Sequence, residues 1–415
     1  DWKDRHPMGI ELTARVRAIP VARTAEDVAW LAGRLEKFFA GATNAIYAPV
    51  GGDENPVTVL QDVEARTVWM PEDAGLIMRT SGSTTGSGRL VGLSAAQMRA
   101  SAAATEARLG GPCSWVLALA PHHIAGLQVV ARALLSEREV VTCEGRVDAE
   151  SIVAAIDRAH AAHPDGRVAV SLVPTQLARL LADEQATAAL ARCTAVLLGG
   201  AAASQELLSQ ADAATITVLT TYGMSETCGG CVYDGVPLEG VRVDLAADGR
   251  IGISGPMVMS GYLDEGPVGE RLITNDLGHW QDGRLIIDGR ADDVINSGAL
   301  KIPADVVARE IMATGMVREA VVVGIDDDTW GQLVCAVVVP GRGWKGPQEL
   351  RDLVGRRIGR VRSPRAVVEA DDLPMLASGK VDRKAATLLA QQRTAAGMVW
   401  LATSNENDSA PADTR

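Results

Sequence analysis

The chain has 415 residues, of which 47% are hydrophobic and 22% are charged, and its formal net charge is −12. This length allows more than one hydrophobic core, so we expect a large domain and a smaller one. The negative charge argues against a nucleic-acid or anionic-membrane partner, because both favour a basic surface. We find no apolar run long enough to span a membrane and no signal-peptide pattern in the first residues. We therefore expect a cytoplasmic protein, and leave open whether it forms a homo-oligomer.

The six cysteines are scattered, and only Cys228 and Cys231 have the spacing of a metal or redox pair. A structural zinc site needs four ligands, and no second pair completes one. A thioredoxin-like pair opens a helix, whereas this pair follows a predicted loop. We expect packing thiols, with redox or metal use as the lesser alternative.

An amphipathic helix is predicted from Thr24 to about Ala40, with Thr24 and Asp27 as a capping pair. A short strand over 75–79 then leads into a run of small and hydroxylic residues that ends in a cation. The run comprises Thr80, Ser81, Gly82, Ser83, Thr84, Thr85, Gly86, Ser87, Gly88 and Arg89. Glycines allow backbone N–H groups to converge on an anion, which favours a phosphate-binding loop. The alternative is a flexible linker, but the preceding strand and a capping box at Ser94 and Gln97 argue against it.

From Ser114 to Leu219 the pattern alternates between strands and helices, which predicts a parallel sheet covered on both faces. The predicted strands are 115–118, 140–142, 168–172, 195–198 and 216–219. His122 and His123 lie at one strand-to-helix junction, where they could line a pocket or simply be solvated. Gly199, Gly200 and Ala201 follow another strand, and suit either a flat ring or tight packing.

A polar loop is predicted over 220–227, directly after the apolar strand 215–219. The carboxyl end of a parallel strand is where open α/β sheets bind ligands. Tyr222 offers a ring, Gly223 a close backbone approach, Ser225 a hydroxyl and Glu226 a carboxylate. Such a set could stack a base, bind phosphate and ligate Mg²⁺, although similar residues occur in ordinary loops.

After Gly230 short strands separated by glycines, at 241–245, 250–254 and 285–288, indicate a β-rich subdomain. We expect a first domain over 1–289, a compact α+β domain over 290–395 and a disordered tail over 396–415. In the second domain helices are predicted near 305–313 and 347–359, and strands at 320–323, 333–339 and 366–368. Ser378 and Gly379 are predicted to form a turn that presents Lys380.

Taken in order, these motifs resemble the acyl-adenylating superfamily of acyl-CoA synthetases, peptide-synthetase adenylation domains and luciferases. The similar motifs are 80–89, Tyr222–Glu226, Ser254–Pro256 with Gly261–Tyr262, Asp276, Gly289–Asp293 and Ser378–Lys380. The resemblance covers the chain from about Leu76 to Lys384, and motifs in sequence are far more specific than one motif alone. It implies an α/β fold with helix-covered parallel sheets, a β-rich subdomain and a small mobile C-terminal domain.

The resemblance implies two half-reactions: a carboxylate attacks the α-phosphate of ATP to give acyl-AMP and pyrophosphate, and the thiol of CoA then displaces AMP. Lys380 would bridge the two reacting anions. Glu226 would ligate Mg²⁺, and Ser225 would donate to the α-phosphate. Thr80–Gly86 and the cation Arg89 would hold the departing phosphates.

The resemblance also implies the nucleotide contacts and the domain movement. Tyr222 would stack on adenine opposite Gly199–Ala201, with Gly223 and Met224 in the same motif. Asp276 would accept hydrogen bonds from the ribose, and Arg290 would lie beside it. Asp292 matches the family's hinge, although it could equally be a surface carboxylate. Gly298 would let the pantetheine arm of CoA pass.

Candidates for the acyl pocket are His123, Gly126 and Thr175, from position alone. Residues 171–181 and 222–230, together with a short amino-terminal region, look most like the o-succinylbenzoate–CoA ligases of menaquinone synthesis. That aromatic acid carries a second carboxylate, which Arg179 could bind unless it is a helix-surface arginine. The alternatives are another aryl- or acyl-CoA ligase, a stand-alone adenylation enzyme and a non-catalytic nucleotide-binding relative.

One departure concerns the phosphate loop. The family loop usually has two residues between its Ser-Gly and the next glycine, whereas Ser83, Thr84 and Thr85 intervene here. Ser87-Gly88-Arg89 also replaces the usual Gly-x-Pro-Lys ending, and arginine keeps the charge but not the compact shape of lysine. The register of the loop and its handling of pyrophosphate are therefore open.

Overall fold

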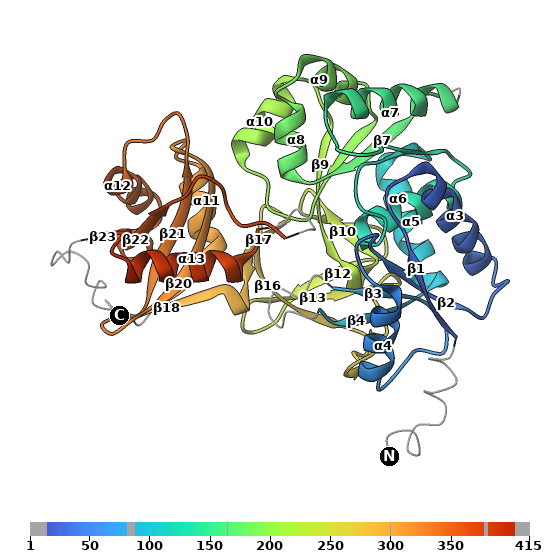
Figure 1. Cartoon of the computed structure of the whole chain (residues 1–415), viewed down its shortest axis with the longest axis horizontal. Helices are drawn as coiled ribbons and strands as arrows, with labels where there is room; N and C mark the ends of the chain where they lie inside the picture. The colour runs from blue at the N-terminus through green and yellow to red at the C-terminus, as the bar shows by residue number, and fades with distance from the viewer. Residues whose placement is uncertain (1–14, 81–87, 164, 299, 377–380, 403–415) are drawn as a thin grey trace.

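The computed structural model describes residues 15–80, 88–163, 165–298, 300–376 and 381–402. Figure 1 shows a large lobe and a small lobe, which are joined through the region of strands β16 and β17. The predicted positions 81–86 and 380 lie outside the described residues. No helix in the described ranges combines the length and the apolar character that a membrane crossing requires.

The central sheet of the large lobe has the strand order β11-β10-β9-β8-β7-β5-β6. Its strands from β5 to β9 run parallel, as the alternating pattern predicted. They are β5 (Ser114–Leu117), β6 (Val140–Thr142), β7 (Val168–Leu172), β8 (Ala195–Leu198), β9 (Val218–Met224), β10 (Gly229–Tyr233) and β11 (Val236–Pro237). Because alternate residues of a strand face opposite sides, Trp115 and Leu117 enter one core, whereas Val116 enters another.

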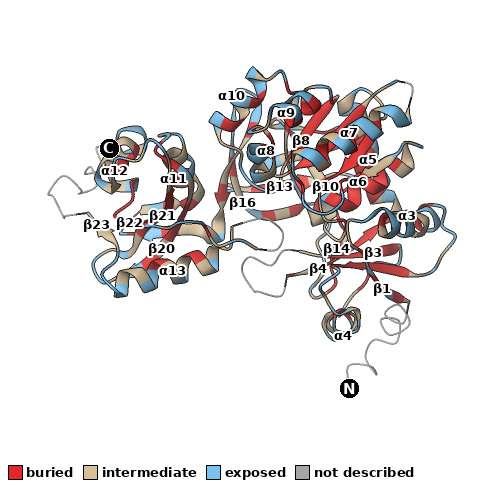
Figure 2. Cartoon of the chain, turned by 45° about the horizontal axis from the view of Figure 1, so that its top comes forward, coloured by how far each residue is buried: buried red, intermediate tan, exposed pale blue. Residues whose placement is uncertain are grey.

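Helices cover both faces of this sheet. One face carries helices α7 (Ala149–Ala162), α8 (Pro174–Leu180), α9 (Glu184–Ala191) and α10 (Gln205–Ala213). The other face carries α3 (Ala25–Phe39), α5 (Ala95–Leu109) and α6 (Ile124–Leu135). Figure 2 shows the buried strands between these layers of partly exposed helices. The predicted caps are confirmed, since Thr24 accepts from the N–H of Asp27, and Ser94 and Gln97 form a capping box.

A second sheet of the large lobe packs below α3, α5 and α6, in the order β1-β2-β3-β4-β14-β15. Its strands are β1 (Val16–Pro20), β2 (Ile46–Val50), β3 (Ala74–Arg79), β4 (Leu90–Ser94), β14 (Gly261–Tyr262) and β15 (Gly266–Pro267). Helix α4 (Pro56–Arg66) covers its outer face through Val59 and Val63. Thr80, where the predicted phosphate loop begins, directly follows β3.

An antiparallel sheet follows in the order β12-β13-β16-β17, as the predicted β-rich subdomain requires. The strands are β12 (Arg242–Leu245), β13 (Arg250–Ser254), β16 (Leu272–Gln281) and β17 (Arg284–Arg290). Residues 274–278, which the sequence analysis did not predict as a strand, form part of β16. Their pairing to both β13 and β17 is non-local, so the short-range pattern did not reveal it.

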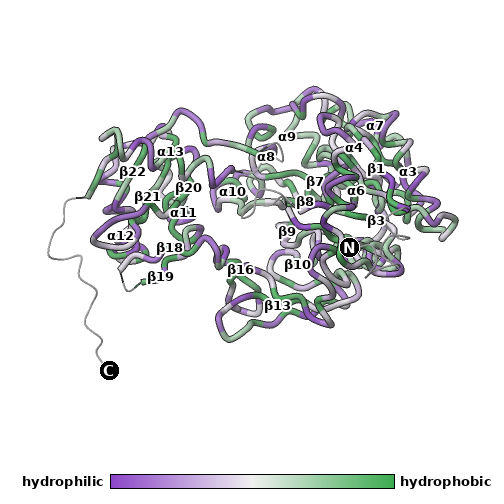
Figure 3. The backbone as a smooth tube through the Cα atoms, turned by 60° about the horizontal axis from the view of Figure 1, so that its bottom comes forward, coloured by the Kyte–Doolittle hydropathy of each residue, from purple (hydrophilic) through white to green (hydrophobic). Residues whose placement is uncertain are grey.

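The small lobe begins where β17 gives way to the 3₁₀ helix η2 (Ala291–Asp293). Its strands are β18 (Val294–Ser297), β19 (Leu300–Pro303), β20 (Val317–Asp327), β21 (Gly331–Pro340), β22 (Ala366–Glu369) and β23 (Trp400–Leu401). Helices α11 (Ala304–Met312) and α12 (Pro347–Ile358) pack on one face of its sheet, and α13 (Arg383–Ala395) packs on the other. The short 3₁₀ helix η3 spans Arg360–Arg362. Figure 3 shows that β20 and β21, at the centre of this lobe, are largely apolar.

Two sequence predictions need correction. Residues 220–224 are not a loop, because β9 continues to Met224 and pairs with β10, with Tyr222 opposite Val232. Thr220, Thr221 and Tyr222 favour a strand once such a partner is available. The tail was predicted to be disordered from residue 396, whereas Trp400 pairs with Val367 of β22; residues 403–415 lie outside the described part of the chain.

Candidate active site

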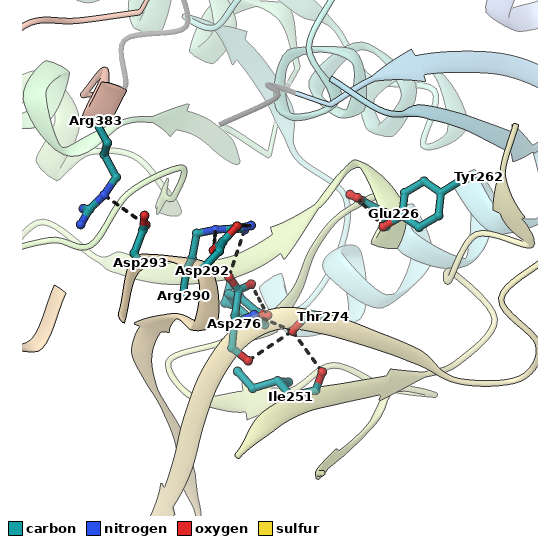
Figure 4. Close-up of polar contacts among 10 residues, drawn as sticks. Glu226, Ile251, Tyr262, Thr274, Asp276, Arg290, Asp292, Asp293 and Arg383 are labelled. Atoms are coloured by element: carbon teal, nitrogen blue, oxygen red, sulfur yellow. Dashed lines mark hydrogen bonds and ion pairs between the residues drawn. The ribbon is translucent and has the colours of Figure 1, made fainter. Parts of the chain in front are cut away.

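The hydroxyl of Tyr222 lies at the centre of the candidate nucleotide site. It donates a hydrogen bond to Asp276 Oδ2 at 2.7 Å, which joins the central sheet to the antiparallel one. Arg290 Nη1 lies 3.5 Å from the other oxygen of Asp276, and Arg290 binds Asp292 through two hydrogen bonds of 2.8 Å. Figure 4 shows Asp276, Arg290 and Asp292 and the contacts among them. Four residues that the sequence analysis selected from three motifs are thus in one network.

Burial and two neighbouring residues act on the pKa of Asp276. Burial raises the pKa of this carboxyl, whereas the hydrogen bond from Tyr222 and the charge of Arg290 act in the opposite direction. The hydrogen bonds to Asp292 raise the pKa of Arg290, so this guanidinium stays charged. Thr274 Oγ1 accepts from the N–H of Asp276 at 3.1 Å and donates to the carbonyl of Ile251 at 3.0 Å. The result is a partly exposed carboxylate that is held in place and can accept hydrogen bonds.

The second part of the site is the 3₁₀ helix η1 (Ser225–Thr227), which turns the chain from β9 into β10. It carries Ser225 and Glu226 side by side. Glu226 is 9% exposed, and its Oε1 accepts a hydrogen bond from the hydroxyl of Tyr262 at 2.9 Å. Burial raises the pKa of Glu226, and the nearby charge of Asp276 acts in the same direction, while Arg89 opposes it. A buried carboxylate is therefore available where a cation would stabilise its ionised form.

Arg89 belongs to the same cluster, because its guanidinium carbon lies 3.1 Å from the ring centroid of Tyr262. It also forms an ion pair with Glu265. The two ends of the predicted phosphate loop meet here: Thr80 N–H donates to the carbonyl of Arg89 at 2.9 Å, and Arg89 N–H donates to Thr80 Oγ1 at 2.8 Å. Residues 81–86, which were predicted to hold the phosphates, lie outside the described residues.

Glycines let the strands approach closely at this site. A Cβ on Gly223 would overlap the carbonyl oxygen of Gly229, and a Cβ on Gly199 would overlap Thr221 Oγ1. Gly199 therefore lies against the residue that precedes Tyr222. Gly200 follows with a φ of +82°, and Ala201 is exposed. Their predicted contact with adenine stays a prediction.

The acyl-pocket candidates have different surroundings. His123 is the N-cap of α6, and its ring centroid lies 4.2 Å from that of His122. Gly126 is buried where a Cβ would overlap the carbonyl oxygen of Ala120, so packing alone accounts for this glycine. Thr175 and Arg179 are exposed on α8. Their role in binding the acid stays a prediction.

Two further predicted residues, Gly298 and Lys380, follow η2 in the chain. Gly298, between β18 and β19, has a φ of +62°, and its N–H donates to the carbonyl of Trp330 at 2.7 Å. Lys380 lies outside the described residues, but Met375 and Val381 on either side of it form an antiparallel bridge. Arg383 contacts Asp293 at 3.1 Å and Asp305 at 2.8 Å, as Figure 4 shows for Asp293. The chain that follows Lys380 is thus anchored next to Asp292.

Sequence reasoning gave no role to several residues that complete the site. Tyr262 was noted as part of a motif, but its bond to Glu226 crosses between two sheets and leaves no local signal. Thr274, Asp293 and Arg383 were given no role, because Thr274 contacts Ile251 and Arg383 contacts Asp293 across long sequence separations. Within the described residues no group of three or more His, Cys, Asp or Glu side chains could hold a metal ion. Magnesium often binds through one or two carboxylates together with substrate phosphates, and Glu226 as its ligand stays a prediction.

The cysteine pair follows η1 in the chain, with Cys228 directly after it and Cys231 in β10. Cys228 and Cys231 are buried free thiols, and burial raises the pKa of both. A buried thiol with a raised pKa is a poor nucleophile and a poor metal ligand at neutral pH. These properties are those of the packing thiols that the sequence predicted.

Comparison with known proteins gives the family. The model of the AMP-binding enzyme family matches residues 47–263, and that of the AMP-binding enzyme C-terminal domain matches residues 309–380. A probable 2-succinylbenzoate–CoA ligase of Mycobacterium tuberculosis (strain CDC 1551 / Oshkosh) is 40% identical over 361 residues, which cover 85% of this chain and 92% of that protein. The 2-succinylbenzoate–CoA ligase of Bacillus licheniformis is 30% identical over 360 residues, covering 79% of this chain and 71% of that protein.

Solved structures share the fold. The o-succinylbenzoate CoA synthetase from Bacillus subtilis, in complex with the acyl-adenylate intermediate OSB-AMP, superposes with a TM-score of 0.70 at 23% identity, covering 89% of this chain and 87% of that one. The amide bond synthetase McbA from Marinactinospora thermotolerans gives a TM-score of 0.74 at 21% identity, covering 90% and 89%. With both domain models in order, a close relative matched over most of its length and the shared fold, the chain belongs to the AMP-binding enzyme family of acyl-adenylating enzymes.

Proposed function

We propose that the chain is an ATP-dependent acid–CoA ligase that converts o-succinylbenzoate to its CoA thioester through an acyl-AMP intermediate. The observation that carries this proposal is 40% identity over 361 residues to a probable 2-succinylbenzoate–CoA ligase. The network of Tyr222, Asp276 and Arg290 beside Glu226 supports it, because it offers a site for a nucleotide and a metal.

In this proposal Asp276 accepts hydrogen bonds from the ribose hydroxyls, and Tyr222 stacks on adenine next to Gly199. Glu226 binds Mg²⁺, which offsets charge on the phosphates, and Ser225 donates to the α-phosphate. The carboxylate and the phosphate repel each other, so their reaction needs a cation between them. Lys380 supplies that charge in the first half-reaction.

The second half-reaction requires room for the thiol of CoA. We propose that the small lobe, beginning at residue 290, moves about Asp292 and brings the glycine turn at Gly298 to the site. The ion pair of Asp292 with Arg290 would then open or re-form during the cycle. The net charge of −12 supports small-molecule ligands rather than nucleic acid, and a cytoplasmic location suits a biosynthetic ligase of this kind.

A panel of acids tests the proposal. The full chain is incubated with ATP, Mg²⁺, CoA and one acid at a time, and pyrophosphate release and the thioester mass are measured. We expect o-succinylbenzoate to be the best substrate. Two truncated analogues, 4-oxo-4-phenylbutanoate and 2-butyrylbenzoate, each lack one of its carboxylates. The analogue without the reacting carboxylate should be inert, and the other should bind more weakly.

The panel also separates the alternatives. A better response to a different acid, with none to o-succinylbenzoate, would reassign the substrate but keep the reaction class. Acyl-AMP without a thioester would indicate a stand-alone adenylation enzyme. No pyrophosphate with any acid, despite ATP binding, would favour a non-catalytic nucleotide-binding protein.

A further inference from the structure

The turn that carries Ser225 and Glu226 ends in an unfavourable backbone conformation. Cys228 follows η1 with a φ of 51° and a ψ of 36°, the left-handed region that glycine adopts most readily. A side chain in this region is destabilising, so the surrounding structure must hold it there. Cys228 is fully buried, and its N–H donates to the carbonyl of Ser225 at 3.1 Å.

Side chains of two helices donate hydrogen bonds to the carbonyl oxygen of Cys228. Ser101 Oγ of α5 donates to this oxygen at 2.9 Å, and Gln128 Nε2 of α6 donates to it at 2.8 Å. Both side chains are 0% exposed. One carbonyl oxygen thus uses both of its acceptor positions on buried side chains that come from different helices.

The cost of burying Gln128 shows that this contact is not incidental. Its Oε1 atom has no hydrogen-bond partner among the described residues. An amide oxygen buried without a partner destabilises the fold, and an apolar side chain of similar shape would avoid that cost. Nε2 also donates to the sulfur of Met98 at 3.5 Å, but a thioether is a weak acceptor, so the bond from Nε2 to Cys228 is the strong interaction that accounts for an amide at this position.

The same face of α5 also holds the other side of the turn. Gln97 lies one helical turn before Ser101, and its Nε2 donates to the carbonyl of Val258 at 3.0 Å and to Ser260 Oγ at 3.1 Å. The residue between them, Met259, donates its N–H to the carbonyl of Glu226 at 2.8 Å. The backbone of Glu226 is consequently fixed on both sides by polar groups that lead back to α5.

We propose that Ser101 and Gln128 are positioning residues that set the η1 turn so that Glu226 and Ser225 meet the Mg²⁺–nucleotide complex. This inference rests on the proposed function, because it takes Glu226 as the metal ligand. The two side chains act through the carbonyl of Cys228 and do not themselves touch the nucleotide.

The test uses Ser101→Ala and Gln128→Met, which remove the donors with little change of shape. Thr105→Val is the matched control, because Thr105 is a buried hydroxyl on the same helix whose Oγ1 lies 3.0 Å from the hydroxyl of Tyr233 instead of near the turn. For each protein we measure the Mg²⁺ dependence of pyrophosphate release with o-succinylbenzoate, the Mg²⁺ dependence of ATP binding by calorimetry, and Tm.

We expect each positioning variant to raise the Mg²⁺ concentration for half-maximal rate about fivefold, the effect of one lost buried hydrogen bond. The control should lower Tm to a similar degree with less than about a twofold change in Mg²⁺ dependence. Unchanged Mg²⁺ dependence in both positioning variants would overturn the inference and leave a structural role. If Gln128→Met does not fold, Ser101→Ala decides alone. If the wild type does not turn over this acid, the proposed function fails, and Mg²⁺-dependent ATP binding still tests the positioning role.

Discussion

At the residue scale, the buried carboxyl of Glu226 affects both the stability of the folded protein and its proposed binding of Mg²⁺. Its carboxyl is 9% exposed, and burial raises its pKa above the ordinary value of 4.5. An ionised carboxylate at this position destabilises the folded protein until a cation arrives. The hydrogen bond that its side chain accepts from Tyr262 opposes but does not remove that cost.

Glu226→Gln should therefore stabilise the free protein at neutral pH. The pKa of the Glu226 carboxyl is higher in the folded protein than in the unfolded chain. The wild type is therefore most stable, relative to the variant, at a pH below the unfolded-state pKa. It loses stability as the pH rises through the folded-state pKa. We expect the variant to exceed the wild type in Tm by about 1–3 °C at pH 7–8, with the difference disappearing below about pH 4. Thermal unfolding across this range measures it, and a pH-independent difference would show that charge is not the cause.

Tyr222→Phe tests the nucleotide half of the site. Without the hydroxyl, the carboxylate of Asp276 loses a bond that orients it and lowers its pKa. We expect the KM for ATP to rise about fivefold with a smaller change in kcat, as for one lost hydrogen bond. Tyr233→Phe is the control, because its hydroxyl is buried against Thr105 and Arg132. An equal rise in KM for both variants would show that the lost hydrogen bond between Tyr222 and Asp276 is not the cause.

At the element scale, the hairpin of β9 and β10 holds Tyr222 and Glu226 at a fixed spacing. The parallel strands could be predicted because their apolar runs are local: β6, β7 and β8 have the predicted bounds. The extension of β9 could not be predicted, because Tyr222 is stabilised in a strand by its pairing with Val232 of β10. The turn that brings these two strands together passes through Cys228. The contacts of Tyr262 with Glu226 and of Arg383 with Asp293 are likewise long-range, and no sequence spacing specifies them.

Gly223→Ala tests this hairpin directly. The added Cβ would overlap the carbonyl of Gly229, so the two strands must separate. We expect a loss of about 2–4 kcal/mol in the free energy of unfolding and loss of activity. Gly33→Ala is the control: no atom lies within 4 Å of its added Cβ, and it lies in α3, so it should be neutral or slightly stabilising. Urea unfolding compares them, and an intact, active Gly223→Ala protein would contradict the proposed close packing.

At the scale of the whole molecule, the site lies where the antiparallel sheet of the large lobe meets the small lobe. Asp276 belongs to β16, Arg290 ends β17, and Asp292 and Asp293 begin the small lobe in η2. Arg383, at the start of α13, binds Asp293 and Asp305. This arrangement supports a small lobe that carries the segment of Lys380 as a unit, which is the basis of the proposed two-step cycle.

Lys380→Ala should separate the two half-reactions. Removing the cation between two anions should slow acyl-AMP formation by at least about 100-fold. Thioester formation from supplied acyl-AMP should change by less than about threefold, because the proposed movement of the small lobe would withdraw the lysine in that step. Rapid-quench assays of each half-reaction measure these rates, with Lys384→Ala as a control in the same segment. Equal loss in both steps would contradict the proposed role.

The most direct test of the two-step ligase is a single-turnover experiment with the full chain, o-succinylbenzoate, α-³²P-labelled ATP and Mg²⁺. Without CoA, the account predicts up to one enzyme-bound acyl-AMP per active site and an equal amount of pyrophosphate. Addition of CoA should then convert this intermediate to the thioester with release of AMP. Formation of ADP, or a thioester that arises without prior acyl-AMP, would contradict the account.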